Sequence, residues 1–270
     1  MSASDSSGLK KQAIRGARWG SIATGAASLL RLVQVIVLAR FLEPEEFGLV
    51  GMTFIVVELG RQFGNMGLSQ ALIQRQNISP SERSSVYWLN LMCGCALFAI
   101  AVASTPLAAR VFGAPELHDL IPVASLSIVL AATSAQFQAL ARKALRFKFL
   151  GIVDIAGAVV LLLTSTIGVA VFDLGVWALV WAQLASRALR AVWLAVDAQR
   201  RNLLPRLHFS LKESASFARF GVFLVGQSLV QTLRKRGDQA LIGALLGAQA
   251  LGYYRVACSV CLEPLRKVNN

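Results

Sequence analysis

The chain has 270 residues, of which 56% are hydrophobic and only 15% are charged, and its mean hydropathy is +0.60. Soluble domains carry roughly 25% charged residues, so this composition excludes a soluble globular protein and indicates a polytopic membrane protein. The net charge of +13 would suggest a nucleic-acid partner in a soluble chain, but in a membrane protein its meaning depends on how the charges are distributed.

The first apolar stretch, Trp19–Leu42, is long enough to cross the roughly 30 Å hydrocarbon core of a bilayer as a helix. The polar residues 1–18 before it are expected to form a cytoplasmic tail, because they lack the cleavage pattern of a removable signal peptide. The stretch ends at Glu43-Pro44-Glu45-Glu46, since three carboxylates and a proline do not remain in lipid. We therefore expect a water-exposed turn there.

Further apolar windows follow, separated by polar interruptions. The spans predicted after the first are Phe47–Phe63, Tyr87–Leu107, Leu120–Leu140, Phe149–Phe172, Gly175–Val196, Phe217–Leu246 and Leu251–Leu265. The sequence thus predicts an all-α integral membrane protein with a six-helix first lobe at residues 19–198. A cytoplasmic linker at 199–216 and the first one or two helices of a second lobe at 217–270 complete the predicted organisation.

Basic residues gather in every second loop. The N-terminal tail and the loops after the second, fourth and sixth spans hold most of the Lys and Arg residues. The intervening loops hold only Arg110, together with six acidic residues: Glu43, Glu45, Glu46, Glu116, Asp119 and Asp173. Because Lys and Arg mark cytoplasmic loops, we expect a multi-pass protein of the inner membrane with its N-terminus in the cytoplasm. The charge of +13 then reflects topology, and no nucleic-acid partner is expected.

The first hairpin returns late in the chain. Residues 39–50 (ARFLEPEEFGLV) pair by residue class with residues 243–254 (GALLGAQALGYY) at a constant offset, and Trp19-Gly20 pairs with Phe220-Gly221 slightly out of that register. Large internal repeats are common in transporters, which place the substrate site between the repeat units. We therefore predict two parallel repeat units related by an axis along the membrane normal.

Several basic residues fall inside predicted spans: Arg31, Arg61, Arg187, Arg190, Arg234, Lys235 and Arg236. Each costs at least about 2.5–3.5 kcal/mol at a helix centre, so each must face a polar cavity or pair with an acid. The acidic residues within or beside the spans are few: Glu58, Asp154, Asp197 and Asp238. Glu58 and Arg61 lie three residues apart on one helix face, and we expect them to pair. A cationic surplus remains in the membrane.

This surplus has two interpretations. The arginines either snorkel and form structural bridges, or they line a cationic cavity for an anionic substrate such as a phosphate-bearing lipid, which the planar guanidinium suits. The repeat favours a cavity, because Arg31 maps beside Arg234 and Lys235. The predicted head-group residues are Arg31, Arg61, Arg234, Lys235 and Arg236. Glu58 and Asp238 either bind a coupling proton or cation, or only neutralise neighbouring arginines.

No catalytic, metal or cofactor site is expected. Cys93-Gly94-Cys95 and Cys258-Ser259-Val260-Cys261 have spacings seen in metal or redox motifs, but both lie in apolar spans where thiolates would be costly. No nucleotide-binding loop, metalloprotease helix or nucleophile elbow is found. An enzyme acting within the membrane is the main rival class, and it lacks a convergent acidic or nucleophilic group here.

Four segments resemble one family in its own order. Ile36–Val50 resembles the first hairpin of the polysaccharide transporter branch of the multidrug/oligosaccharidyl-lipid/polysaccharide exporter superfamily. Met66–Arg75 resembles the end of its second helix, Gly175–Val180 the start of its sixth, and Asp238–Tyr254 its seventh-to-eighth helix segment. The motifs are moderately specific together and weak singly.

The resemblance implies a flippase that carries a polyprenyl-pyrophosphate-linked oligosaccharide to the outer leaflet for capsule, exopolysaccharide or lipopolysaccharide synthesis. Two lobes would rock against each other around the cavity. Membrane lipid and a polymerase or glycosyltransferase machinery are the implied partners. Family members carry two complete lobes, so this chain is expected to be truncated. Two alternatives remain: a drug or cation antiporter of the same superfamily, which should have an acidic cavity, and a non-transporting membrane fragment.

Overall fold

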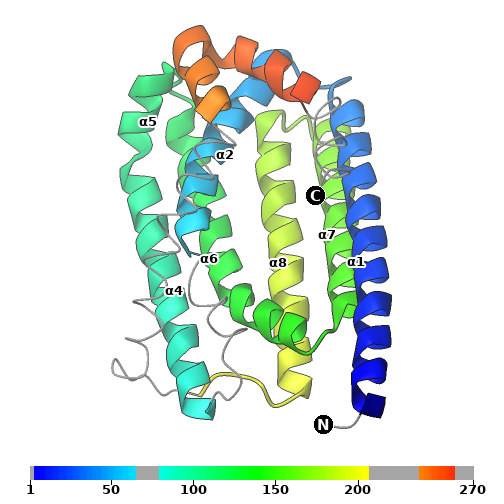
Figure 1. Ribbon diagram of the computed structural model, residues 1–270. Coiled ribbons are helices and arrows are strands. Elements are labelled where there is room, and N and C mark those ends of the chain that lie inside the picture. The colour runs from blue at the N-terminus through cyan, green and yellow to red at the C-terminus, as the bar shows by residue number, and fades with distance from the viewer. Residues whose placement is uncertain (1–2, 65–78, 207–236, 259–270) are drawn as a thin grey trace.

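The computed structural model describes residues 3–64, 79–206 and 237–258, and within these ranges every regular element is a helix (Figure 1). The helices are α1 (Ala3–Leu38), α2 (Pro44–Gly64), α4 (Pro80–Ala103), α5 (Thr105–Phe112), α6 (Leu117–Lys143), α7 (Phe147–Ala170), α8 (Val176–Arg200) and a last helix, Gly237–Cys258. Within the described ranges, six helices are long and apolar enough to cross a membrane: α1 from Arg18 onward, α4, α6, α7, α8 and the last helix. The prediction of an all-α membrane protein is confirmed.

The first helix differs from its predicted span at both ends. α1 begins at Ala3, so the predicted tail at residues 1–18 continues the helix of the first span. It ends at Leu38, and the turn to α2 follows directly. α2 has Pro44 at its first position and two glutamates in its first turn, a composition that suits the partial positive charge of a helix N-terminus.

The third predicted span is divided into two helices. α4 begins at Pro80, earlier than predicted, because Ser79 and Glu82 form a capping box in which the Ser79 hydroxyl accepts a hydrogen bond from the Glu82 backbone N–H at 3.1 Å. The short α5 then follows with Pro106 in its first turn. Proline has no N–H to continue the backbone hydrogen-bond ladder, which explains why the single span predicted over Tyr87–Leu107 is interrupted.

α6 is the central helix of the bundle. In its apolar window 67% of the residues are buried, whereas no other candidate span exceeds 33%. α2, α4 and α8 pack around it, α7 packs on α8, and α1 packs on α7, so that α1 and α4 lie on opposite flanks (Figure 1). The fully buried Leu117, Ile121 and Ile128 of α6 meet Met52 of α2 and Val180 of α8 in the main hydrophobic cluster.

The two sets of loops distinguished by charge lie at opposite ends of the bundle (Figure 1). The acidic end comprises the turns before α2, α6 and α8 and the first helical turns of α2 and α6, with Glu43, Glu45, Glu46, Glu116, Asp119 and Asp173. The basic end comprises the start of α4, the turn between α6 and α7, and the end of α8, with Arg83, Arg142, Lys143, Arg146, Lys148, Arg200, Arg201 and Arg206. Which end faces the cytoplasm stays a prediction.

An ion pair fastens α8 to the turn between α6 and α7 at the basic end. The two terminal nitrogens of Arg146 donate to both carboxylate oxygens of Asp197, at 2.6 and 2.8 Å, and Arg201 approaches the same carboxylate at 3.4 Å. The Arg146 guanidinium also lies over the ring of Phe149, 4.3 Å from its centroid. The hydrogen bonds to Asp197 raise the pKa of Arg146, so this contact holds the arginine charged.

We expect Asp197→Ala to destabilise the protein by roughly 1–3 kcal/mol, because it leaves a largely buried guanidinium with unsatisfied donors. Only 22% of the Arg146 side chain and 20% of the Asp197 side chain are exposed. Thermal unfolding in detergent measures the effect. Glu116→Ala is the control, since Glu116 is exposed and its side chain makes no cap hydrogen bond. Equal midpoints for the two variants would contradict the prediction.

The last helix is bent (Figure 1). Gly247 lies within it, between the two separate spans that we predicted. The φ of 81° at Gly247 lies in the left-handed region that glycine adopts without strain. On one side of the bend, Asp238 accepts a hydrogen bond from the Tyr254 hydroxyl on the other side, at 2.6 Å. This bond holds the two halves of the helix at their angle.

Two glycines bring the start of α2 against the last helix. A Cβ atom on Gly48 would collide with the backbone of Ala248, and one on Gly252 would collide with the backbone of Pro44. Under the residue pairing given above, Pro44 corresponds to Ala248 and Gly48 to Gly252, so one contact is made twice. We call it the reciprocal glycine contact. An approximate two-fold axis between repeat units would produce such reciprocity.

In a third contact, a residue meets its own counterpart. Such a contact must lie close to a two-fold axis that relates the two repeat units. A Cβ atom on Gly51 would meet the side chain of Arg255, its counterpart in the same pairing. Arg255 also donates a hydrogen bond to the carbonyl of Phe47 at 3.0 Å. The repeat itself, and the predicted boundaries of the linker and of the second lobe, stay predictions because residues 207–236 and 259–270 lie outside the described ranges.

Candidate functional site

The structure describes two of the residues predicted to bind an anionic head group, Arg31 on α1 and Arg61 on α2. Arg61 donates to both carboxylate oxygens of Glu58, with its Nε at 2.8 Å, which confirms the predicted pair. Arg31 is exposed. The other predicted head-group residues lie outside the described ranges: Arg234, Lys235 and Arg236.

Arg187 of α8 lies among the described positive charges. Four charged side chains act on it electrostatically: Arg31 of α1, Arg61 and Glu58 of α2, and Arg190 of α8. Within the described ranges, no carboxylate forms an ion pair with Arg187. The like charges around it repel, so the surplus favours binding of an anion.

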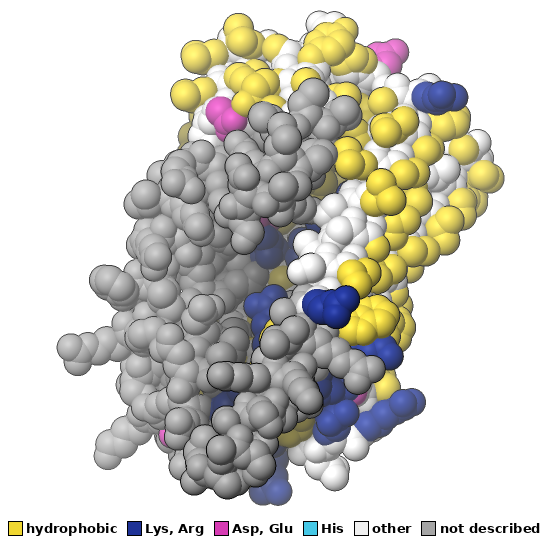
Figure 2. Space-filling model, turned by 45° about the vertical axis from the view of Figure 1, so that its right-hand side comes forward, with side chains coloured by type: hydrophobic (Ala, Val, Ile, Leu, Met, Phe, Trp, Pro, Cys, Tyr) yellow, Lys and Arg dark blue, Asp and Glu magenta, His cyan; other side chains and the backbone are white. Residues whose placement is uncertain are grey.

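Arg190 extends this group toward the basic end. It forms an ion pair with Asp154 of α7 at 2.8 Å, and Arg142 of α6 acts on it electrostatically. We call the five arginines the arginine cluster: Arg31, Arg61, Arg142, Arg187 and Arg190. In the described part of the chain they are accompanied by only two carboxylates, those of Glu58 and Asp154. Figure 2 shows Lys and Arg side chains gathered in the lower half of the visible face, with hydrophobic side chains over the upper flank.

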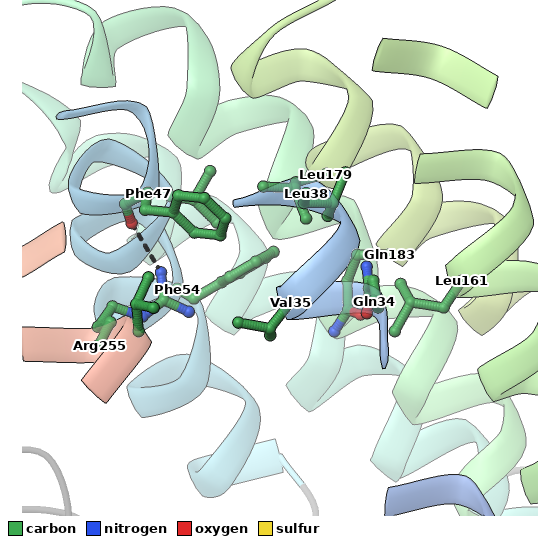
Figure 3. Close-up of a pocket in the computed structure, with 11 residues that line it drawn as sticks. Gln34, Val35, Leu38, Phe47, Phe54, Leu161, Leu179, Gln183 and Arg255 are labelled. Carbon is green, nitrogen blue, oxygen red and sulfur yellow. Dashed lines mark hydrogen bonds between the residues drawn. The ribbon is translucent and has the colours of Figure 1, made fainter. Parts of the chain in front are cut away.

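Two neighbouring cavities lie between α2, α8 and the last helix, and α1 lines one of them. The charged cavity, ≈ 120 Å³, is lined by residues that include Glu58, Arg61, Ser127, Arg187 and Gln239. The apolar cavity, ≈ 140 Å³, is lined by residues that include Gln34, Leu38, Phe47, Leu161 and Leu179 (Figure 3). Both are lined by Phe54, Gln183 and Arg255, so they adjoin. Each has room for several waters or for a small polar group.

α8 presents an ordered series of side chains to these cavities. Leu179, Gln183 and Arg187 follow one another at four-residue intervals, which places them on one face of the helix. Leu179 lines the apolar cavity, Gln183 lines both cavities, and Arg187 lines the charged one. From the acidic end to the basic end, α8 therefore changes from an apolar side chain to an amide and then to a guanidinium.

α1 repeats this order, and α2 repeats its apolar and charged ends without an amide between them. On α1, Leu38 and Gln34 line the apolar cavity, and Arg31 follows one turn toward the basic end. On α2, Phe54 lies between the two cavities and Arg61 lies in the charged one. The three helices thus form an apolar level, an amide level with Gln34 and Gln183, and a charged level. Such a gradient suits a ligand with an anionic end and a neutral polar part.

Sequence reasoning identified only part of this site. Arg187 and Arg190 were recognised as membrane-embedded cations but were not assigned to the head-group site, and Arg142 was placed in a cytoplasmic loop. Gln34 and Gln183 were not singled out. The available signal was an amide one turn from a membrane-embedded arginine on the same helix.

The cysteines of the described ranges form no site. Cys93, Cys95 and Cys258 are free thiols. Among the described residues, no group of three or more His, Cys, Asp and Glu side chains could hold a metal ion. The charged side chains that line the two cavities are those of Glu58, Arg61, Arg187 and Arg255.

A family model described as polysaccharide biosynthesis protein matches residues 37–270. Two curated relatives are 31% identical over 261 residues, or 97% of this chain: the lipopolysaccharide biosynthesis protein WzxC of Escherichia coli (strain K12) and the teichuronic acid biosynthesis protein TuaB of Bacillus subtilis (strain 168). The succinoglycan biosynthesis transport protein ExoT of Rhizobium meliloti (strain 1021) is 28% identical over 92% of this chain. These matches cover 53%, 54% and 49% of the respective relatives, so the chain spans about half their length.

Two solved structures resemble this one. A multidrug resistance transporter of the MATE family in an inward-facing conformation has a TM-score of 0.65, 15% identity, and coverage of 90% of this chain and 59% of its own. A mutant of the MATE transporter VcmN of Vibrio cholerae has a TM-score of 0.61, 15% identity, and coverage of 97% and 63%. At this identity the likeness concerns the fold alone.

Proposed function

The chain belongs to the family of polysaccharide biosynthesis proteins, as its helix motifs predicted, and we propose that it forms part of a flippase for a lipid-linked oligosaccharide. The substrate is a polyprenyl-pyrophosphate-linked oligosaccharide that supplies a surface polysaccharide such as capsule, exopolysaccharide or lipopolysaccharide. The names of the relatives support this, since all three concern surface polysaccharides and one is called a transport protein.

The observation that carries the proposal is the cationic surplus of the arginine cluster. A pyrophosphate presents several oxygens that accept hydrogen bonds from planar guanidiniums, two at a time. Arg187 lies half-buried among like charges beside the charged cavity, so an anion bound there would offset their repulsion. The polyprenyl chain, being apolar, would remain in lipid.

Transport requires the cavity to be exposed to each side of the membrane in turn. In our proposal, the reciprocal glycine contact closes the acidic end, and rocking of the two repeat units separates it. The acidic end faces the outside and the N-terminus lies in the cytoplasm, in line with the charge of the loops. The inner membrane is the location that this orientation and the family support.

The remaining roles are also proposals. Glu58, paired with Arg61, and Asp238, bonded to Tyr254, are the candidates for coupling to a proton or cation. Lipid-linked oligosaccharide and membrane lipid are the direct ligands, and the polymerase or glycosyltransferase machinery that makes and uses the oligosaccharide is the proposed partner.

The two alternative functions lead to different expectations. A drug or cation antiporter of the same fold should present an acidic cavity to its cationic substrate, whereas the described charges here are mainly basic. A non-transporting membrane fragment would have no transport phenotype at all. Neither alternative explains why five arginines from four helices gather around two carboxylates.

The test is deletion of the gene in its natural host, followed by return of the natural protein. We expect the deletion to abolish the surface polysaccharide and to accumulate the lipid-linked oligosaccharide on the cytoplasmic leaflet, as measured by protection from an added glycosidase in spheroplasts. Sensitivity to cationic drugs should not change. Intact surface polysaccharide after deletion would contradict the flippase, and raised drug sensitivity alone would favour the antiporter.

A further inference from the structure

The amide level between the apolar and charged levels contains two side chains that the pyrophosphate does not need. Gln34 is 6% exposed, and its amide nitrogen donates to the Ser165 hydroxyl at 3.0 Å. Ser165 in turn donates to the carbonyl of Leu161 at 2.7 Å. This chain of hydrogen bonds fixes the Gln34 amide, and no hydrogen bond to its oxygen is found within the described ranges.

Gln183 is placed where the two cavities adjoin. It lines both of them, and in the described part of the chain its amide makes no hydrogen bond. Because it faces both cavities, the Gln183 amide is available to a ligand that replaces water there. The amide is neutral and offers one acceptor and two donors, which suits hydroxyl groups better than it suits an anion.

The wall opposite these amides is aromatic. Figure 3 shows Phe47 and Phe54 across the apolar cavity from Gln34 and Gln183, with Arg255 beside the two rings, where it donates a hydrogen bond to the Phe47 carbonyl. Amides on one side and flat apolar rings on the other form a site for a neutral ring compound that has hydroxyl groups on its edge and C–H groups on its face. A hexose is such a compound.

We propose that Gln34 and Gln183 bind the first sugar of the oligosaccharide while its pyrophosphate lies in the arginine cluster, an inference that rests on the proposed function. The spacing supports it. Residues one helical turn apart on one face have Cβ atoms roughly 5–6 Å apart, which is comparable with the separation between the centre of a sugar ring and the outer phosphate of a pyrophosphate on its first carbon. Gln183 and Arg187 have this spacing along α8.

The amide level would thereby distinguish a glycosylated lipid from the bare carrier. A flippase that discriminates in this way exports the loaded lipid and does not exchange it for polyprenyl pyrophosphate. The two amides carry no charge, so their hydrogen bonds to the sugar would add to the binding of the pyrophosphate by the arginine cluster.

The test uses the natural protein, purified in nanodiscs, with two probes: a polyprenyl pyrophosphate, and the same lipid with one hexose on its pyrophosphate. We expect wild type to bind the hexose-bearing probe about tenfold more tightly than the bare probe, as two neutral hydrogen bonds supply. Gln183→Leu and Gln34→Leu should reduce this preference to about two- to threefold. Gln199→Leu, an exposed position on the same helix, should keep it.

The outcomes separate the two proposals. A preference that is absent in wild type, or unchanged in Gln183→Leu, overturns the sugar site while leaving the flippase intact, provided that both probes still bind. If neither probe binds to wild type, the proposed function itself fails. Arg187→Ala should weaken both probes by the same factor and leave their ratio unchanged. Gln34 is buried, and its replacement can prevent folding. If Gln34→Leu does not fold, Gln183→Leu decides the test.

Discussion

Arg187→Ala is expected to weaken binding of a pyrophosphate-bearing lipid by roughly 10- to 100-fold and to abolish most of the surface polysaccharide. Hydrogen bonds to charged groups contribute about 1.5–3 kcal/mol each, and about 1.4 kcal/mol corresponds to a tenfold change in affinity. Arg187 belongs to the arginine cluster and has no ion pair in the described ranges.

The same variant should be folded and at least as stable as wild type. Arg187 is surrounded by Arg31, Arg61 and Arg190, so its removal relieves repulsion between like charges. Loss of function with equal or higher thermal stability is the behaviour of a binding residue, because stability and function compete at such positions. A large loss of stability would instead indicate a structural arginine.

Two further variants serve as controls. Arg187→Lys keeps the charge but loses the planar fork, and we expect intermediate binding. Arg40→Ala removes an exposed cation at the turn before α2, away from both cavities, and should behave as wild type. If Arg40→Ala were as defective as Arg187→Ala, general electrostatics would explain the effect, and the case for a specific site would be lost.

Gly48→Ala is expected to reduce transport by at least about tenfold and to lower the thermal midpoint. The new methyl group would collide with the backbone of Ala248, and overpacking of this kind costs typically 1–3 kcal/mol. Gly252→Ala should have a similar effect, because it would collide with the backbone of Pro44 in the reciprocal position. Surface polysaccharide and thermal unfolding in detergent measure both effects.

The matched control is Gly25→Ala in α1, where a Cβ atom would meet nothing within 4 Å. An alanine in a helix interior is favoured over glycine by about 1 kcal/mol, so this variant should be neutral or slightly more stable. The double variant Gly48→Ala/Gly252→Ala should cost less than the sum of its single variants, since both disrupt one interface. Wild-type behaviour of Gly48→Ala would show that the acidic end does not close through this contact.

The helices of the fold could be predicted from the sequence because the bilayer restricts the alternatives. A backbone in lipid must satisfy its own hydrogen bonds, so each apolar window became a helix and the acidic turn at Glu43–Glu46 became a break. Helix ends were less predictable, because Ser79 and Pro106 act through local capping and the loss of one backbone donor. These signals are visible in the sequence, but hydropathy predicts different helix ends at the same positions.

The site could be predicted only in part, because it depends on how each helix is rotated and on which distant segments meet. Arg31 and Arg187 are both cations in apolar helices, but only packing places them near each other. The pairing of Gly48 with Gly252 is visible as a repeated motif. The contact between the two copies of the motif is long-range. A comparison of the two segments does not predict it.

The most direct test of a head-group site in the arginine cluster is photo-crosslinking with a polyprenyl-pyrophosphate oligosaccharide that carries a photoreactive group beside the pyrophosphate. We expect the label on peptides of α2 and α8 that contain Arg61 and Arg187, and we expect inorganic pyrophosphate to compete with it. Label confined to α4 on the opposite flank, or label that Arg187→Ala leaves undiminished, would contradict the account.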